Sequence, residues 1–227
     1  MEVKRVTERP YCPDVYDSYI KKTVPYAYDF YEQAASLIAH YGNPDGRLLD
    51  LGCGTGLFEK KLREHFPEID IVALDPSEEM LEEARKKDVA KVEYEKGTSA
   101  SIEYENEFDE VTAIESHHLM RPDERKRAVK KVFTALKGGG IFIAFENIVP
   151  ENDFLRETEL SRWQDFQIKS GKPEDEARIH RARCGVYYFP ITVEEHVELL
   201  KKTGFVNVYV FWRSYMQMGI MGMKPLT

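Results

Sequence analysis

Cysteine and long apolar runs are scarce in this sequence. Its 227 residues include three cysteines, Cys12, Cys53 and Cys184, which lie far apart. An odd number of widely spaced cysteines suggests neither a disulfide framework nor a metal site of paired cysteines, so a reducing environment is expected. No apolar run approaches the length that spans a bilayer, and the first residues lack the apolar centre of a signal peptide. We therefore expect a cytoplasmic protein with no membrane contact and no bound metal.

Positive charge is also in the minority, with 32 Lys and Arg against 40 Asp and Glu and a formal net charge of -8. Because nucleic-acid binders usually display a basic footprint, nucleic acid is not the expected partner. The composition, 42% hydrophobic and 32% charged, is typical of a folded globular protein. The length suits a single domain over residues 1–227. The oligomeric state stays open, with a homodimer as one alternative.

Short apolar runs alternate with amphipathic stretches through the first two thirds of the chain. The predicted strands cover residues 47–51, 69–75, 91–95, 108–114 and 141–148. Between them, residues 57–66, 76–88 and 122–140 show helical spacing of apolar residues, with Pro76 at a first helical position and Gly138–Gly140 ending the last helix. This alternation predicts a doubly wound α/β fold, in which a mostly parallel sheet is covered on both faces.

The flanking segments have other patterns. A tyrosine-rich stretch over residues 16–41 predicts one helix, within an amino-terminal helical lid of residues 1–42. Residues 149–190 are polar and largely helical, too long for a simple connection, and are expected to form a helical cap over a site. A further helix ending at Gly204 and two antiparallel strands complete the chain. The methionines of the last strand are expected to pack in the core: Met216, Met218, Met221 and Met223.

Three glycines, Gly52, Gly54 and Gly56, follow the first predicted strand. A dinucleotide site has the spacing G-x-G-x-x-G, whereas the third glycine comes one residue early here, and no P-loop lysine follows. The pattern favours an adenosine ligand without phosphate, whose amino acid end carries an ammonium group. Asp50 can accept a hydrogen bond from that ammonium. Asp75 ends the second strand roughly 20 residues further on, where an acid can hold ribose hydroxyls, although it could also cap the following helix.

The motif LLDLGCGTG followed by VALDPSEEML resembles the class I S-adenosylmethionine-dependent methyltransferases, and the resemblance covers essentially the whole chain. It implies a Rossmann-like sheet of seven strands with an antiparallel last strand, and S-adenosylmethionine as cofactor. In the family, the loop after the third strand often reads Gly-Asp-Ala, and Thr98 replaces the acid here. The resemblance implies these cofactor-binding residues: Asp50, Gly52, Cys53, Gly54, Gly56, Asp75, Pro76, Met80, Thr98, Ser99, Glu115 and Ser116.

The second half, with ESHHLM, the Trp163 stretch and YMQMGIMGMK, is similar to the carboxy-S-adenosylmethionine synthases and neighbouring methyltransferases. In the synthases an arginine binds the extra carboxylate, and the resemblance places Leu199 at that position. Without a cation there, burying a second carboxylate would be costly. We therefore expect Leu199 to oppose that activity.

The catalytic residue stays unassigned, with His117 and His118 as candidates for a general base. If this segment is extended, the two rings point to opposite sides and at most one faces a ligand. The candidates for substrate binding are Tyr19, Tyr26, His117, Glu146 and Trp163. Three cap arginines could hold an acidic substrate or could form a solvated helix face: Arg178, Arg181 and Arg183.

These features support three hypotheses. The first is an enzyme that transfers the methyl group of S-adenosylmethionine to a small-molecule substrate by in-line displacement. The second is the synthesis or use of carboxy-S-adenosylmethionine in the modification of wobble uridine in tRNA. The third is a non-catalytic S-adenosylmethionine-binding protein. The residues do not identify the accepting atom, among nitrogen, oxygen, sulfur and carbon, or the pathway.

Overall fold

A seven-stranded sheet forms the centre of the protein in a computed structural model that describes residues 12–226. The strands are β1 (Arg47–Leu51), β2 (Asp70–Asp75), β3 (Val92–Lys96), β4 (Phe108–Ile114), β5 (Leu136–Asn147), β6 (Val206–Ser214) and β7 (Gln217–Met223). Their spatial order is β3-β2-β1-β4-β5-β7-β6. The first five strands are parallel, and β7 runs antiparallel to both of its neighbours. The predicted α/β fold with an antiparallel last strand is confirmed.

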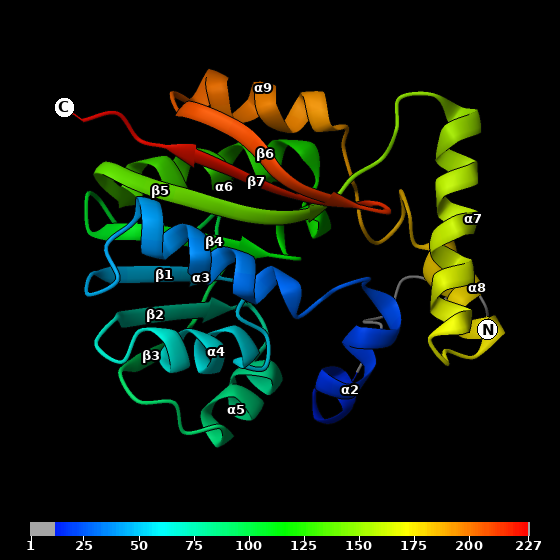
Figure 1. Cartoon of the computed structure of the whole chain (residues 1–227), viewed down its shortest axis with the longest axis horizontal. Helices are drawn as coiled ribbons and strands as arrows, with labels where there is room; N and C mark the ends of the chain where they lie inside the picture. Colours follow the sequence, from blue (N-terminus) through cyan, green and yellow to red (C-terminus); the bar gives the residue numbers. More distant parts are fainter. Residues whose placement is uncertain (1–11, 227) are drawn as a thin grey trace.

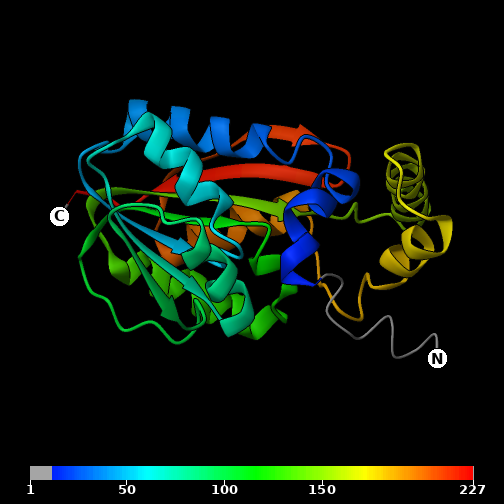
Figure 2. The same ribbon diagram turned by 90° about the horizontal axis from the view of Figure 1, so that it is seen from below.

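Helices cover both faces of this sheet (Figure 2). On one face lie α3 (Asp29–Tyr41), α4 (Leu57–His65) and α5 (Glu78–Lys86), and on the other lie α6 (Pro122–Ala135) and α9 (Val193–Thr203). Successive strand residues serve the two faces, because side chains alternate along a strand. Leu48 packs in the cluster with α3 and α4, and Leu49 packs in the cluster with α6 and α9.

Three helices stand beyond the carboxyl ends of β1, β2 and β4 (Figure 1). They are α2 (Pro13–Thr23), α7 (Asp153–Lys169) and α8 (Glu174–Ala182), and a short 3-10 helix, η1 (His117–Leu119), follows β4. A third, smaller core cluster, which includes Trp163 and Tyr188, lies in this region. Residues 149–190, expected to be largely helical, thus contain α7 and α8. The first eleven residues of the predicted lid lie outside the described part of the chain.

The prediction of one helix over residues 16–41 is wrong, because the stretch contains two helices. Helix α2 ends before Val24, whose ψ of 117° is extended, and Pro25 follows it. A residue that precedes proline is disfavoured in the helical region, which explains the break. Tyr26 then has a positive φ of 59° and is 58% exposed, so it lies at the bend rather than on a helix face.

The boundaries around the glycines at 138–140 also differ from the prediction. Helix α6 ends at Ala135, and β5 already begins at Leu136. The amide N–H of Gly139 donates to the carbonyl of Lys224, and the Lys224 N–H donates to the carbonyl of Gly140. The neighbouring chain therefore offers hydrogen bonds that continue the strand, which local sequence could not reveal.

Two further predictions concern the start of α5 and the methionines near the carboxyl end. The first is wrong and the second is confirmed. Helix α5 begins at Glu78 with Ser77 as its N-cap, so Pro76 lies before the helix and Asp75 is not the cap. The four methionines of the last segment pack as expected: Met216, Met218 and Met221 are buried, and Met223 packs against the core.

Candidate functional site

The glycine turn after β1 has the backbone that its sequence predicts. Gly52, Gly54 and Gly56 all have positive φ, at 87°, 56° and 79°. A Cβ on Gly54 would meet nothing within 4 Å, whereas one on Gly52 would lie 2.5 Å from the Cβ of Ser116. A Cβ on Gly56 would approach Ala84 of α5 at 3.1 Å. Gly54 thus leaves room for a ligand, and the other two glycines allow close packing.

Asp75 at the end of β2 lies directly beside this turn. One carboxylate oxygen accepts from the Gly54 N–H at 3.0 Å, and the other accepts from the Ser77 N–H at 2.8 Å. Both carboxylate oxygens thus accept backbone hydrogen bonds, and Asp75 also lines the cavity described below. Asp75 therefore connects the turn with the start of α5.

Asp50 lies below the turn, only 2% exposed, and accepts from the Thr112 hydroxyl at 2.5 Å. Burial raises the pKa of Asp50 to about 6, although the bond from Thr112 acts in the opposite direction. The side chain of Glu59 is fully buried nearby, and burial also raises its pKa. Asp50 thus supports the turn from beneath rather than lining the cavity.

A cavity of about 360 Å³ opens beside the glycine turn. From the sheet side, nine of the predicted cofactor residues line it: Gly52, Gly54, Asp75, Pro76, Met80, Thr98, Ser99, Glu115 and Ser116. They come from the loops after four parallel strands, whose carboxyl ends meet at one edge of the sheet. The other three predicted residues, Asp50, Cys53 and Gly56, are not part of this cavity wall.

Glu115 and Ser116 follow β4 in a strained turn. Glu115 has a φ of 53°, which is uncommon for a residue with a side chain, and its N–H donates to the Phe145 carbonyl. Its carboxyl group is buried, and burial raises its pKa well above the ordinary value, with a further contribution from Glu146. The Ser116 hydroxyl donates to the Leu51 carbonyl at 2.7 Å. This bond holds the two loops together under the cavity.

The two candidate histidines have different surroundings. They lie in the 3-10 helix η1 rather than in an extended segment, yet only His118 lines the cavity. The Nε2 of His117 lies 2.9 Å from the Ser99 hydroxyl oxygen, and the ring is 1% exposed. Burial lowers the pKa of each histidine to about 3. Both rings are therefore neutral at physiological pH.

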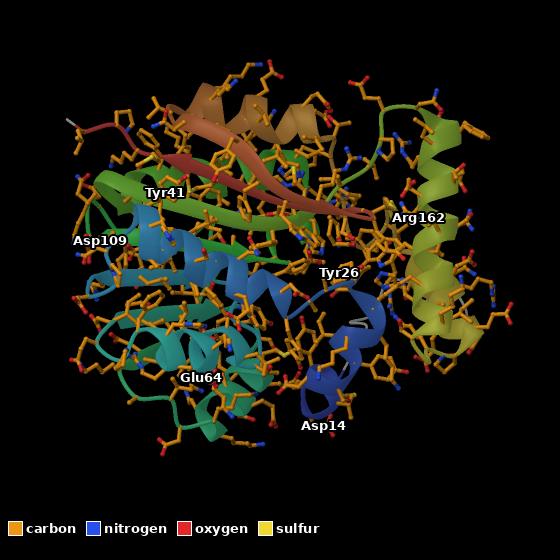
Figure 3. All side chains as sticks on the ribbon, viewed as in Figure 1. Asp14, Tyr26, Tyr41, Glu64, Asp109 and Arg162 are labelled. Atoms are coloured by element: carbon orange, nitrogen blue, oxygen red, sulfur yellow. The ribbon has the colours of Figure 1, made fainter. Side chains whose placement is uncertain are left out.

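Of the predicted substrate-binding residues, only Trp163 lines the cavity. Its indole N–H donates to the Thr23 carbonyl at 2.7 Å, which joins α7 to α2. Glu146 is 2% exposed beneath the wall. The Tyr19 hydroxyl donates to Glu176, and this bond helps raise the Tyr19 pKa to about 12. Tyr26 lies at the bend between α2 and α3 (Figure 3), and its ring lies edge-on to Trp212.

Sequence reasoning missed most of the far wall of the cavity. This wall comes from α2, α8 and the segment after α8: Tyr16, Ile20, Thr23, Val24, His180, Arg183, Tyr187 and Tyr188. The tyrosine-rich start and the cap arginines were the available signals. Of the three candidate arginines, only Arg183 lines this cavity, whereas Arg178 and Arg181 line a separate groove on the cap.

Leu199 is not near the far wall. It packs in the core cluster beneath α9 and borders a small interior cavity with Arg125 and Glu146. A residue in this position does not contact a ligand in the main cavity. The expectation that Leu199 opposes a second carboxylate stays a prediction, while the cation that lines the main cavity is Arg183.

Comparisons with known proteins agree with this geometry. Residues 48–140 match the family model described as a methyltransferase domain. Over these residues the chain is similar to methyltransferase domains, and solved structures that share its fold include S-adenosylmethionine-dependent methyltransferases. This enzyme is 27% identical over 203 residues to a carboxy-S-adenosyl-L-methionine synthase of Nautilia profundicola, covering 88% of this chain and 86% of the relative.

Two solved structures share the fold of this methyltransferase. One is phosphoethanolamine N-methyltransferase 2 of Haemonchus contortus with phosphomonomethylethanolamine and S-adenosylhomocysteine, at a TM-score of 0.70 and 15% identity, covering 99% of this chain and 60% of that one. The other is an S-adenosylmethionine-dependent methyltransferase of Thermotoga maritima, at 0.61 and 23%, covering 93% and 95%.

Metal-binding clusters and membrane-spanning helices are both absent from residues 12–226. No cluster of His, Cys, Asp and Glu suited to a metal ion occurs within this range. No helix in the same range has the length and apolar character required to cross a membrane.

Proposed function

We propose that this enzyme transfers the methyl group of S-adenosylmethionine to a small acceptor that carries an anionic group. One observation carries the proposal: a single cavity has the glycine turn and Asp75 on one wall and Arg183, Trp163 and three tyrosines on the other. A cofactor on the first wall and an acceptor against the second would share one enclosed space, where proximity and alignment promote transfer.

On the first wall, this chain offers groups that match the cofactor. Gly54 leaves space for close approach, and Asp75, which lines the same cavity, would bind the ribose hydroxyls. Met80 would pack near the adenine, with Thr98 and Ser99 as polar neighbours. When bound, S-adenosylmethionine supplies a methyl group already activated by its sulfonium. The protein then mainly has to orient the acceptor and exclude water.

On the second wall, Arg183 is 8% exposed and is the reason for proposing an anionic acceptor. A buried guanidinium favours a carboxylate or phosphate partner, because its planar donors match those groups. Its guanidinium carbon lies 6.0 Å from the ring centre of Tyr187. Lys172, on the same side, donates to Thr23 and Gln167. Arg183, the cation that lines the cavity here, would give the acceptor an orientation.

A second candidate is the synthesis of carboxy-S-adenosylmethionine. The similarity to the carboxy-S-adenosyl-L-methionine synthase of Nautilia profundicola favours it. Arg183 also supports it, because this cation could hold the extra carboxylate in place of the acceptor's anionic group. A non-catalytic S-adenosylmethionine-binding protein is the third reading, and turnover with any acceptor would exclude it.

The first experiment is native mass spectrometry of gently purified protein, with the exact mass of any released ligand. S-adenosylmethionine or S-adenosylhomocysteine would support methyl transfer and lead to a panel of small carboxylates and phosphate esters that carry amine, hydroxyl or thiol groups. Carboxy-S-adenosylmethionine would instead establish the second candidate. Because a weakly held ligand can be lost, titration calorimetry with S-adenosylhomocysteine then measures the affinity of the empty protein.

The assignment of Asp75 has its own test. Asp75→Ala should weaken S-adenosylhomocysteine binding by about tenfold or more, since a charged hydrogen-bond partner is worth about 1.5–3 kcal/mol. Asp70→Ala is the matched control, because Asp70 lies on the same strand but faces solvent and pairs with Arg47. Equal affinity of folded Asp75→Ala and wild type would refute the ribose assignment.

A further inference from the structure

A polar cluster is buried behind the cavity wall, at the carboxyl end of β5. Glu146 lies between the two histidines of η1. Its Oε1 is 4.0 Å from Nδ1 of His117, and its Oε2 is 3.7 Å from Nδ1 of His118. Arg125 packs on the same cluster and donates to the carbonyls of His117 and Phe189. The buried carboxyl group of Glu146 thus lies near Nδ1 of both histidine rings.

Among the described residues, three atoms of this cluster lack a hydrogen bond, of which one is Nη1 of Arg125 and the other two face each other. Within residues 12–226, neither Nδ1 of His118 nor Oε2 of Glu146 has a partner, although both atoms are buried. Unpaired buried polar atoms are rare because each is costly. These two face each other at 3.7 Å, and a small movement closes that distance to a hydrogen bond. Each atom is therefore the natural partner of the other.

The Nε2 side of the His118 ring lies toward the cavity instead of toward Glu146. Nδ1 and Nε2 lie on opposite sides of an imidazole, so a ring that turns Nδ1 toward Glu146 turns Nε2 away from it. His118 lines the cavity beside Ser116 and Met120. His117 differs, because its Nε2 lies at hydrogen-bond distance from the hydroxyl of Ser99. Only His118 combines a carboxyl group behind the ring with a free edge toward the cavity.

We propose that His118 is the general base of the reaction and that Glu146 is a positioning residue, which accepts the Nδ1–H of His118 and leaves the lone pair of Nε2 facing the acceptor. This inference rests on the proposed methyl transfer. In the step, the O–H or N–H bond of the acceptor breaks and its proton moves to Nε2. The bonding electrons stay on the acceptor atom, which becomes the nucleophile. The proton later leaves His118 for solvent.

The charge of Glu146 decides how strong this base is. Burial raises the pKa of Glu146 to about 8, while Arg125 opposes that shift. Below this pH the carboxyl group is neutral, and above it the carboxylate stabilises the imidazolium that forms. The other titratable groups around the pair are Glu115, His117, Arg125, His180 and His196. The rate of methyl transfer should therefore rise with pH toward about 8.

The first test does not require an acceptor. Two-bond ¹H–¹⁵N correlation spectra of histidine-labelled, ligand-free protein report which ring nitrogen of His118 carries the proton, with His118→Asn for assignment. In spectra recorded above about pH 8, where Glu146 is ionised, the proposal predicts the Nδ1–H form in wild type and the Nε2–H form in Glu146→Leu. An Nε2–H form in wild type would overturn the proposal, and this result stands even if Glu146→Leu does not fold.

The second test uses whichever panel acceptor gives the highest turnover. Glu146→Gln should lower kcat by about 10²-fold, the lower end of general-base effects, with little change in KM. It should also remove the rise in rate toward about pH 8, and Glu146→Asp should restore part of both. Unchanged kcat with an unchanged pH profile would contradict the role of Glu146.

Glu110→Gln is the control, because Glu110 is another fully buried carboxyl group, at the opposite end of the sheet from the cavity. It should leave kcat as in wild type. If no acceptor in the panel is methylated, the proposed function fails, while the spectra still decide whether the His118–Glu146 pair exists.

Discussion

The two walls of the cavity are built in different ways. The sheet wall consists of segments at the carboxyl ends of parallel strands. Their positions depend on backbone conformation at Gly52 and Gly54 and on hydrogen bonds to the Asp75 side chain. The cap wall brings together α2, α7, α8 and the segment after α8. Few long-range bonds join these pieces, among them Trp163 to Thr23. The sheet wall thus rests on local geometry, and the cap wall rests on tertiary contacts.

The sheet and the cap also differ in the size of their buried apolar clusters. Two large apolar clusters lie on the faces of the sheet, whereas the cap has a small cluster of five buried residues: Val149, Leu160, Trp163, Tyr188 and Met216. Regions with few buried apolar contacts open at lower free energy than the core. A cap that opens readily suits the entry of substrate, and a rigid sheet edge suits the binding of a cofactor that is common to many enzymes.

The sharpest test of this comparison uses two glycines with nearly equal φ, Gly52 at 87° and Gly171 at 86°. An alanine at either position has a left-handed conformation that costs about 1–2 kcal/mol. Gly52→Ala also places a Cβ 2.5 Å from that of Ser116, while Gly171→Ala meets nothing within 4 Å. Overpacking adds about 1–3 kcal/mol, so urea unfolding should show the larger loss for Gly52→Ala. Equal losses of unfolding free energy in the two variants would mean that the sheet wall accommodates an added Cβ as easily as the cap does.

A second pair separates ligand space from folding. A Cβ on Gly54 or on Gly185 meets no atom within 4 Å, but only Gly54 lines the cavity. Gly54→Ala should lower the affinity for S-adenosylhomocysteine by about tenfold or more, or about 1.4 kcal/mol, and Gly185→Ala should not change it. Titration calorimetry measures both. Wild-type affinity in Gly54→Ala would place the cofactor elsewhere.

The smallest effect concerns pH and has opposite signs in the two regions. In the sheet, burial raises the pKa of Glu110 to about 8 from 4.5, so the folded state binds more protons in this window and unfolding becomes easier as pH rises. In the cap, burial lowers the pKa of Lys172 to about 7 from 10.5. The unfolded state binds more protons in that window, so stability rises with pH there.

Urea unfolding across these windows, with two variants, measures each contribution. Glu110→Gln should remove the loss of stability between pH 4.5 and about 8, and Lys172→Met should remove the gain between about 7 and 10.5. Each contribution is at most about 1.4 kcal/mol per pH unit. If the two variants change the pH dependence in the same direction, the explanation by burial is wrong.

The order of strands and helices could be predicted from the sequence because each element has a clear local pattern of apolar residues. The glycine turn was readable as well, since its positive φ values require glycine at those positions. The break between α2 and α3 at Val24 could have been inferred from Pro25. It was missed because the apolar residues on both sides of it have helical spacing. The start of β5 at Leu136 could not be inferred, because it depends on hydrogen bonds with the chain near Lys224.

The sequence by itself determined the α/β fold and nine residues of the sheet wall, because strand ends and glycine turns are local and converge at one edge of a parallel sheet. Only the tertiary structure decided that Arg183 lines the cavity and Leu199 does not, and that Glu146 lies behind His118. These choices depend on contacts between residues far apart in the chain. Spacing along the sequence carries no information about them.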